Sequence, residues 1–292
     1  MITAKQVQEL RELTGAGMMD CKKVLVETEG DLQKAAELLR ERGITKAAKK
    51  SSRIAAEGLV DTYISDDKKV AVAIEVNAET DFVGKNPEFK EYVQNTAKIV
   101  ADKNPKDLEE LKELEYEEGK TVQGKLTDLI AKIGENMNLR RFARIETDGL
   151  VVPYVHGEGR IAVLVELAKG TEEAGQNVCL QVASMRPEFT FREEVPAERV
   201  EKELEIYLEQ VKNEGKPEDI ADKIAQSKVD KLFFGEIVLL DQPYVKDNSM
   251  KISEYLEAND SELKSFVRFE KGEGLEKREE NFAEEVAKQM NS

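Results

Sequence analysis

The sequence is short of the side chains on which many enzymes and metal proteins depend. Its 292 residues include one histidine and two cysteines, Cys21 and Cys179, which lie far apart in the chain. Without a second histidine or a nearby cysteine, histidine-based metal sites and cysteine–histidine dyads have little support. The chain also lacks the Gly-x-x-x-x-Gly-Lys-Ser/Thr phosphate loop, the Gly-x-Ser-x-Gly elbow and the His-Glu-x-x-His helix. We therefore expect no enzyme, no metal and no cofactor.

Long apolar segments are also missing. No run reaches the roughly 18 apolar residues of a membrane span. The first five residues, Met-Ile-Thr-Ala-Lys, do not have the basic and then apolar plan of a secretory signal. Two distant cysteines give no disulfide framework. These absences predict a cytoplasmic protein that does not enter a membrane.

Positive charge is scarce relative to negative charge. Asp and Glu number 60 against 44 Lys and Arg, so the formal net charge is −16. A field of this sign repels phosphate backbones and anionic membranes, so it argues against direct binding of nucleic acid. It does not exclude a protein partner that itself handles nucleic acid.

What is present begins with a small helical module at residues 1–45. Apolar residues at helical spacing predict three short helices, with Thr3 and Asp31 as N-caps and glycines at the ends. The third helix is predicted to end at Gly43. The basic residues 46–56 lack interleaved aromatic residues, so they favour a solvated helical linker over a nucleic-acid patch.

An internal repeat organises the middle of the chain. Residues 57–76 align without gaps on residues 148–167 at a constant offset of 91, which pairs Gly58 with Gly149 and Glu75 with Glu166. Each copy has two strand-like runs around a turn and is followed by a helical segment. The fold class is therefore α+β, with two related subdomains that each carry a small antiparallel sheet. We assign residues 57–140 to the first subdomain, and residues 141–195 with 233–270 to the second.

A helical hairpin interrupts the second subdomain at residues 196–232. Its apolar seam is narrow, which suits a local structural arm, a homodimer contact or a contact with another partner; the sequence leaves these open. Beyond it we expect a strand at 236–240, a helix at 252–259 and a strand at 266–270. Residues 271–292 form a C-terminal module with a helix at 281–290.

Three polar segments contain residues that could serve a function. Phe82 lies in the stretch 77–86 directly after a strand, and the second repeat has no aromatic residue there. A buried corner residue is the more ordinary interpretation of Phe82, although an aromatic confined to one copy favours function. Gly134 is explained by a helix C-cap alone, and His156 by a hairpin turn.

These motifs occur in an order that closely resembles the bacterial elongation factor Ts family. The resemblance rests on 14–23 (Thr-Gly-Ala-Gly-Met-Met-Asp-Cys-Lys-Lys) and 75–83 (Glu-Val-Asn-Ala-Glu-Thr-Asp-Phe-Val). It continues through Ile-Gly-Glu-Asn at 133–136, Val-His-Gly at 155–157, Gln-Pro at 242–243 and Arg-Phe-Glu-Lys-Gly-Glu-Gly at 268–274. It covers essentially the whole chain.

The resemblance implies a guanine-nucleotide exchange factor that binds GDP-loaded elongation factor Tu and speeds release of GDP. The three-helix module would resemble a ubiquitin-associated domain and dock on the GTPase, and the segment after Gly274 would dock near the nucleotide pocket. Asp81 and Phe82, flanked by Thr80 and Val83, would wedge beside the magnesium site. The other partner-binding residues that it implies are Met18, Met19, Lys22, Ile133, Gly134, His156 and Val245.

Two other functions compete with nucleotide exchange. An adaptor or chaperone-like protein built on the three-helix module would bind a partner without affecting nucleotide. An enzyme acting through its carboxylates is the third reading, which the missing catalytic motifs oppose.

Overall fold

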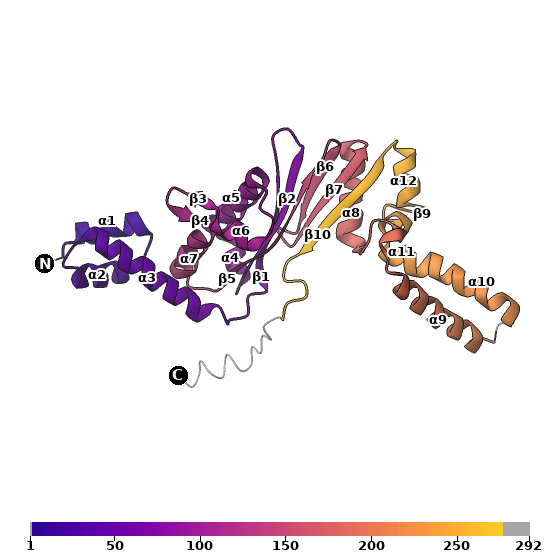
Figure 1. The fold of residues 1–292 in the computed structure, drawn as a ribbon, viewed down its shortest axis with the longest axis horizontal. Helices are drawn as coiled ribbons and strands as arrows, with labels where there is room; N and C mark the ends of the chain where they lie inside the picture. Colours follow the sequence, from indigo (N-terminus) through magenta and orange to yellow (C-terminus); the bar gives the residue numbers. More distant parts are fainter. Residues whose placement is uncertain (1, 216, 277–292) are drawn as a thin grey trace. The chain divides into compact units, whose positions relative to one another are not determined.

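The computed structural model describes residues 2–215 and 217–276, and these form an α+β fold of two compact units (Figure 1). The first unit takes in Met1–Asp61, Ile74–Phe142 and Glu270–Ser292, and the second takes in Thr62–Ala73 and Ala143–Phe269. The predicted helix at 281–290 lies outside the described residues. Within the described part of the chain, no helix is both long and apolar enough to span a membrane.

The three-helix module forms as expected at its start. Its helices are α1 (Ala4–Thr14), α2 (Met18–Glu27) and α3 (Leu32–Lys50). Thr3 caps α1 in a capping box with Gln6, and Asp31 caps α3 through two backbone N–H groups. A small core of Leu10, Cys21, Val24 and Leu25 is fully buried among these helices.

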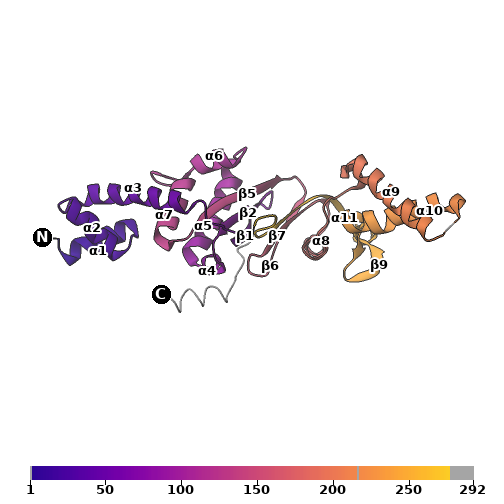
Figure 2. The same ribbon diagram turned by 90° about the horizontal axis from the view of Figure 1, so that it is seen from below.

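The end of α3 differs from the prediction. The helix does not stop at Gly43 but continues to Lys50, and in Figure 2 it runs from α1 and α2 to α7. Gly43 is buried, and a Cβ placed on it would lie 3.4 Å from the Cβ of Ala131 on α7. The glycine therefore serves close helix packing rather than termination, a role that its local sequence does not distinguish from a C-cap.

The first sheet has three strands in the order β1-β2-β5. They are β1 (Glu57–Ile64), β2 (Val70–Ala78) and β5 (Met137–Glu146). Between β2 and β5 the chain forms α4 (Asp81–Lys85), α5 (Pro87–Lys103), α6 (Leu108–Glu113), the short strands β3 (Glu115–Glu117) and β4 (Lys120–Thr121), and α7 (Val122–Ile133). Helix α5 supplies the fully buried rings of Phe89 and Tyr92.

The second sheet repeats this plan in the order β6-β7-β10. Its strands are β6 (Leu150–His156), β7 (Ile161–Lys169) and β10 (Glu262–Glu270). Helix α8 (Glu172–Met185) packs on β6 and β7, and the short strands β8 (Pro243–Tyr244) and β9 (Asp247–Lys251) lead into α12 (Ile252–Ala258). The core includes Val163, Val165, Val178 and Leu239.

The repeat in the sequence has a physical basis in both sheets. A Cβ on Gly58 would lie 2.3 Å from the carbonyl oxygen of Val76, and one on Gly149 would lie 2.1 Å from that of Leu167. Both positions therefore need glycine because two strands approach closely there. The paired glutamates Glu75 and Glu166 are both buried in the middle strand of their sheet and bind basic residues of the third strand.

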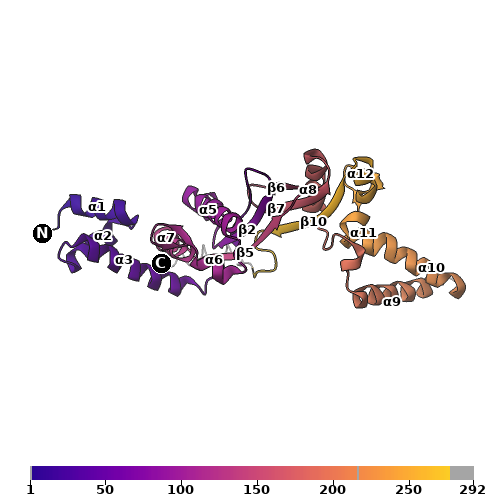
Figure 3. The same cartoon turned by 45° about the horizontal axis from the view of Figure 1, so that its top comes forward.

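The predicted hairpin consists of α9 (Ala197–Asn213) and α10 (Glu218–Lys228), which lie antiparallel in Figure 3. A π-helical turn (Val229–Phe233) and α11 (Phe234–Ile237) follow α10. At their base, Arg192 of the short 3₁₀ turn Arg192–Glu194 donates to Asp241 at 2.6 Å and to Asp230 at 2.8 Å.

The predicted strand at 236–240 is wrong. Its residues end α11 and enter a 3₁₀ turn (Leu239–Asp241), and only Val238 pairs, in an isolated bridge with Phe189. Ile237, Val238 and Leu239 are all buried. A short, fully buried apolar run has no alternation that distinguishes a strand from a compact turn, which explains the error.

Candidate partner-binding site

Phe82, which the sequence singles out, lies in a turn directly after β2. We call this turn, residues 79–83, the Phe82 corner. Here Phe82 is 77% exposed while the next residue, Val83, is 3% exposed. Burial of Val83 fixes the one-turn helix α4 against the first unit, so Phe82 faces away from it. The alternative interpretation of Phe82 as a buried corner residue is therefore wrong, because its neighbour Val83 takes that role.

The second repeat shows that exposure is the normal state of this position. At the offset of 91, Phe82 corresponds to Glu173, which is also exposed, in the first turn of α8. A carboxylate at such a position is soluble without a partner, whereas an exposed phenylalanine leaves a large apolar surface in water. The first unit therefore exposes an aromatic ring at the position where the second unit exposes a charged side chain.

A carboxylate from a distant part of the chain braces the corner. Glu135 accepts the Thr80 backbone N–H at 3.0 Å and the Thr80 hydroxyl at 2.9 Å. In the second repeat Thr171 instead uses its hydroxyl to cap α8 by accepting from Ala174. Thr80 makes no such cap to α4, since its hydroxyl is committed to Glu135.

A second set of bonds joins the corner to the end of the linker. Glu79 accepts the backbone N–H of Asn136 at 2.6 Å and pairs with Arg53 at 3.3 Å. The side-chain amide of Asn136 donates to the Arg53 carbonyl at 2.8 Å. Residues 79–80, 135–136 and 53 thus form one hydrogen-bonded cluster that holds the chain just before Phe82. Glu79 and Glu135 belong to the motifs at 75–83 and 133–136, but the sequence alone assigns neither of them a bracing role.

Asp81 and Lys85 give the corner a local electrostatic feature. They form an i,i+4 ion pair at 2.9 Å, and this hydrogen bond lowers the pKa of Asp81. The Lys85 ammonium also lies 5.9 Å from the centroid of the Phe82 ring. Both side chains are exposed, so a partner can replace these contacts at small cost.

Ile133 and Gly134 lie at the end of α7, immediately before the bracing residues. Gly134 adopts φ 91°, and its N–H donates to the Ile130 carbonyl, which makes it a left-handed C-cap. Ile133 is half-buried. The cap turns the chain so that Glu135 and Asn136 reach the corner.

The predicted residues of the module lie at the start of α2. Met18 is 59% and Met19 64% exposed, and Lys22 is exposed one turn after Met18. Two flexible thioether side chains in water form a small adaptable apolar surface. It lies on the first unit, as does the corner.

His156 and Val245 belong to the second unit. His156 ends β6, is exposed, and its Nδ1 lies 2.9 Å from the Tyr154 hydroxyl. Val245 is 42% exposed between β8 and β9, and its N–H donates to Gln181 at 2.8 Å. Both side chains are accessible, His156 at the end of a strand and Val245 between two short strands.

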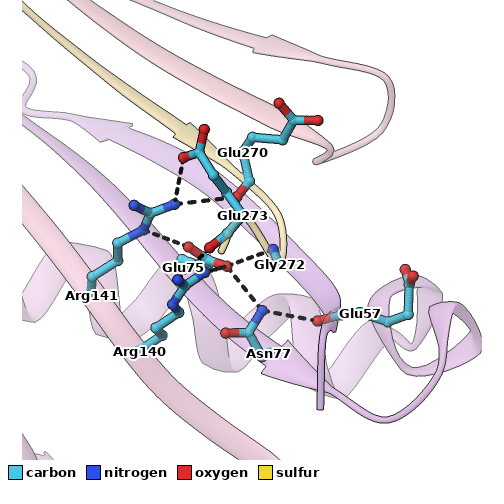
Figure 4. A network of polar contacts seen from close by, with 8 residues as sticks. All are labelled: Glu57, Glu75, Asn77, Arg140, Arg141, Glu270, Gly272 and Glu273. Atoms are coloured by element: carbon cyan, nitrogen blue, oxygen red, sulfur yellow. Dashed lines mark hydrogen bonds and ion pairs between the residues drawn. The ribbon is translucent and has the colours of Figure 1, made fainter. Parts of the chain in front are cut away.

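A buried network anchors the segment that follows β10 (Figure 4). The Glu75 carboxylate, which is fully buried, pairs with Arg140 at 2.9 Å and Arg141 at 2.6 Å. It also accepts the Gly272 N–H at 2.8 Å. A Cβ on Gly272 would lie 2.1 Å from the Ala56 carbonyl oxygen, so only glycine permits this approach. The network fixes residues 270–273, at the end of β10 and just after it, to the first unit.

Among the residues described, no group of three or more His, Cys, Asp or Glu side chains is placed to hold a metal ion. The accessible features are instead an aromatic corner, a methionine pair and strand-end residues. Such an arrangement suits binding to a protein surface.

Comparison with known proteins agrees with this description. The family model described as "Elongation factor TS" matches residues 79–273. A protein of Clostridium novyi (strain NT), named elongation factor Ts, is 53% identical over 100% of this chain and 99% of its own length. Proteins of the same name from Clostridium perfringens (strain SM101) and Clostridium botulinum (strain Alaska E43) are 52% and 50% identical, each over 99% of both chains.

A full-length match at this level defines the chain as a translation elongation factor. It belongs to the elongation factor Ts family.

Proposed function

We propose that this protein is a guanine-nucleotide exchange factor that binds GDP-loaded elongation factor Tu and promotes release of GDP. On this proposal it acts by binding alone, without a chemical step of its own. The partner contacts are the Phe82 corner, Met18, Met19 and Lys22 of the module, Ile133 and Gly134, and His156 and Val245.

The observation that carries the proposal is the exposure of Phe82 on a braced turn. The ring is 77% exposed, yet the residues beneath it are fixed by the hydrogen bonds from Thr80 to Glu135. A rigid aromatic side chain loses little conformational entropy on binding, so it suits insertion between elements of a partner. Asp81 beside it adds a negative charge that would compete with phosphate for the partner's magnesium ion.

The free energy needed for nucleotide exchange is larger than burial of the Phe82 ring can supply. Weakening nucleotide binding about 10⁴-fold needs about 5.5 kcal/mol of differential binding. Burial of one phenylalanine supplies about 1.5–3 kcal/mol. The remainder must come from contacts elsewhere on the chain, in agreement with candidate residues on both units.

A release assay tests the proposal. Elongation factor Tu loaded with a fluorescent GDP analogue is mixed with excess unlabelled GDP, with and without this protein, and the loss of fluorescence is followed. We expect the release rate to rise with the concentration of this protein until it saturates. Binding that leaves the release rate unchanged would instead identify an adaptor or chaperone-like protein without exchange activity.

A further inference from the structure

Residues 131–136, at the C-terminal end of α7 and just beyond it, contact both the three-helix module and the Phe82 corner. Ala131 faces Gly43 of α3, where a Cβ on the glycine would lie 3.4 Å away. Lys132 lies against the turn between α1 and α2, because a Cβ on Gly15 would be 3.6 Å from its Nζ. That turn leads directly into Met18 and Met19.

The residues that follow, 134–136, contact the end of α3 and the base of the Phe82 corner. A Cβ on Gly134 would lie 3.6 Å from the Nζ of Lys50, the last residue of α3. Glu135 then binds Thr80, and Asn136 binds Glu79 and Arg53. Within six residues, from 131 to 136, the chain therefore contacts α3 at its middle and its end, the module turn, and the base of the corner.

Helix α3 provides the rigid connection between these points. It has 19 residues, which at 1.5 Å per residue is about 28 Å, with no break at Gly43. A flexible linker would let the module move independently of the corner, so that each would bind a partner as a separate contact. A continuous helix packed on α7 gives the two contacts a fixed spacing.

We propose that Gly43 is a positioning residue: its lack of a bulky side chain lets α3 pack on Ala131 of α7, which holds the methionine pair and the Phe82 corner at one fixed separation. This inference rests on the proposed exchange function and adds to it how the first unit delivers two contacts together. Fixed spacing raises the effective concentration of the second contact once the first has formed.

The distance between module and core is the direct test. Both native cysteines are buried, so spin labels can be attached to introduced cysteines at two exposed sites, Val26 on α2 and Glu91 on α5. We expect a narrow distance distribution for the parent chain. Gly43→Leu adds three carbon atoms beyond the methyl group that would already touch Ala131, so it should broaden or shift the distribution.

Exchange kinetics supply the second readout. Gly43→Leu should raise the KM for GDP-loaded elongation factor Tu about tenfold or more, because two linked contacts become two weak ones. Its kcat should change less, since the corner itself is intact. Gly43→Ala, whose methyl group would make an ordinary contact with Ala131 at 3.4 Å, should keep a near-parent KM. Glu41→Leu places the same side chain on an exposed position of the same helix and controls for added apolar surface.

Ala131→Leu enlarges the other side of the same contact, on α7. Because this substitution lies outside the module, it tests the contact even if Gly43→Leu disturbs folding of the module. Circular dichroism melts confirm that each variant is folded. An unchanged distance distribution in both leucine variants, or a broadened distribution with an unchanged KM, would overturn the proposal. If the parent chain did not speed GDP release from elongation factor Tu, the exchange function would be rejected. The distance measurement would still decide whether Gly43 sets the spacing.

Discussion

At the scale of single residues, exposure and burial separate at adjacent positions. Phe82 is exposed and Val83 is buried, although both are apolar and both belong to the one-turn helix α4. In the second copy the corresponding position is also exposed and holds Glu173. Stability should therefore be insensitive to position 82, and exchange should depend on it.

Phe82→Ala and Phe82→Glu test this separation. We expect the free energy of unfolding, measured by urea denaturation, to change by less than about 0.5 kcal/mol, as for other exposed positions. The stimulated rate of GDP release should fall in both variants by more than the affinity for the partner does. Val83→Ala is the matched control, and it should destabilise the protein by about 1–2 kcal/mol through lost burial. An unchanged release rate in Phe82→Ala would remove this ring from the mechanism.

At the scale of elements, the two sheets share a buried glutamate with different partners. Glu75 is held by two arginines and a backbone N–H, whereas Glu166 is held by Lys264 at 2.8 Å and Ser265 at 2.7 Å. For Glu166 burial by itself disfavours the charged form. The hydrogen bonds from Lys264, Ser265 and Thr147 outweigh it and lower the pKa of this carboxyl.

Glu166→Gln should change how stability depends on pH. Because the pKa of Glu166 is lower in the folded than in the unfolded protein, its ionised form stabilises the fold above the unfolded pKa of about 4.3. That contribution disappears as pH falls through the lower, folded pKa. We therefore expect the variant to be less stable than the parent at neutral pH in urea denaturation, and the difference to shrink below about pH 4. A difference that stays constant from neutral to acid pH would show that ionisation of Glu166 does not contribute.

The sequence predicted elements well where periodicity and caps agreed. Thr3, Asp31 and the two repeated hairpins identified the module and both sheets. It failed where one residue type serves two purposes: Gly43 packs a helix instead of ending it, and the apolar residues 237–239 form a compact turn instead of a strand. Both failures arise from tertiary contacts, which no local pattern contains.

The sequence likewise predicted only part of the candidate site. Phe82 was found because it breaks the repeat, but its braces were not. Glu135 lies 55 residues from Thr80 in the chain, and Gly272 lies 197 residues from Glu75. With 60 acidic residues in the chain, no sequence signal pairs Glu135 with Thr80 or Glu75 with Gly272. A homodimer contact through α9 and α10 stays a prediction.

At the scale of the whole molecule, exchange is a negative coupling between two ligands of one GTPase. If this protein weakens GDP binding by some factor, GDP must weaken binding of this protein by the same factor. The candidate contacts on both units can supply such a coupling only if they are stronger on the nucleotide-free partner. An adaptor would instead bind both forms equally.

Titration calorimetry of this protein with elongation factor Tu, nucleotide-free and GDP-loaded, measures that coupling directly. We predict much tighter binding to the nucleotide-free form, by a factor equal to the loss of GDP affinity measured when this protein saturates the partner. Equal affinity for the two forms would contradict the exchange function.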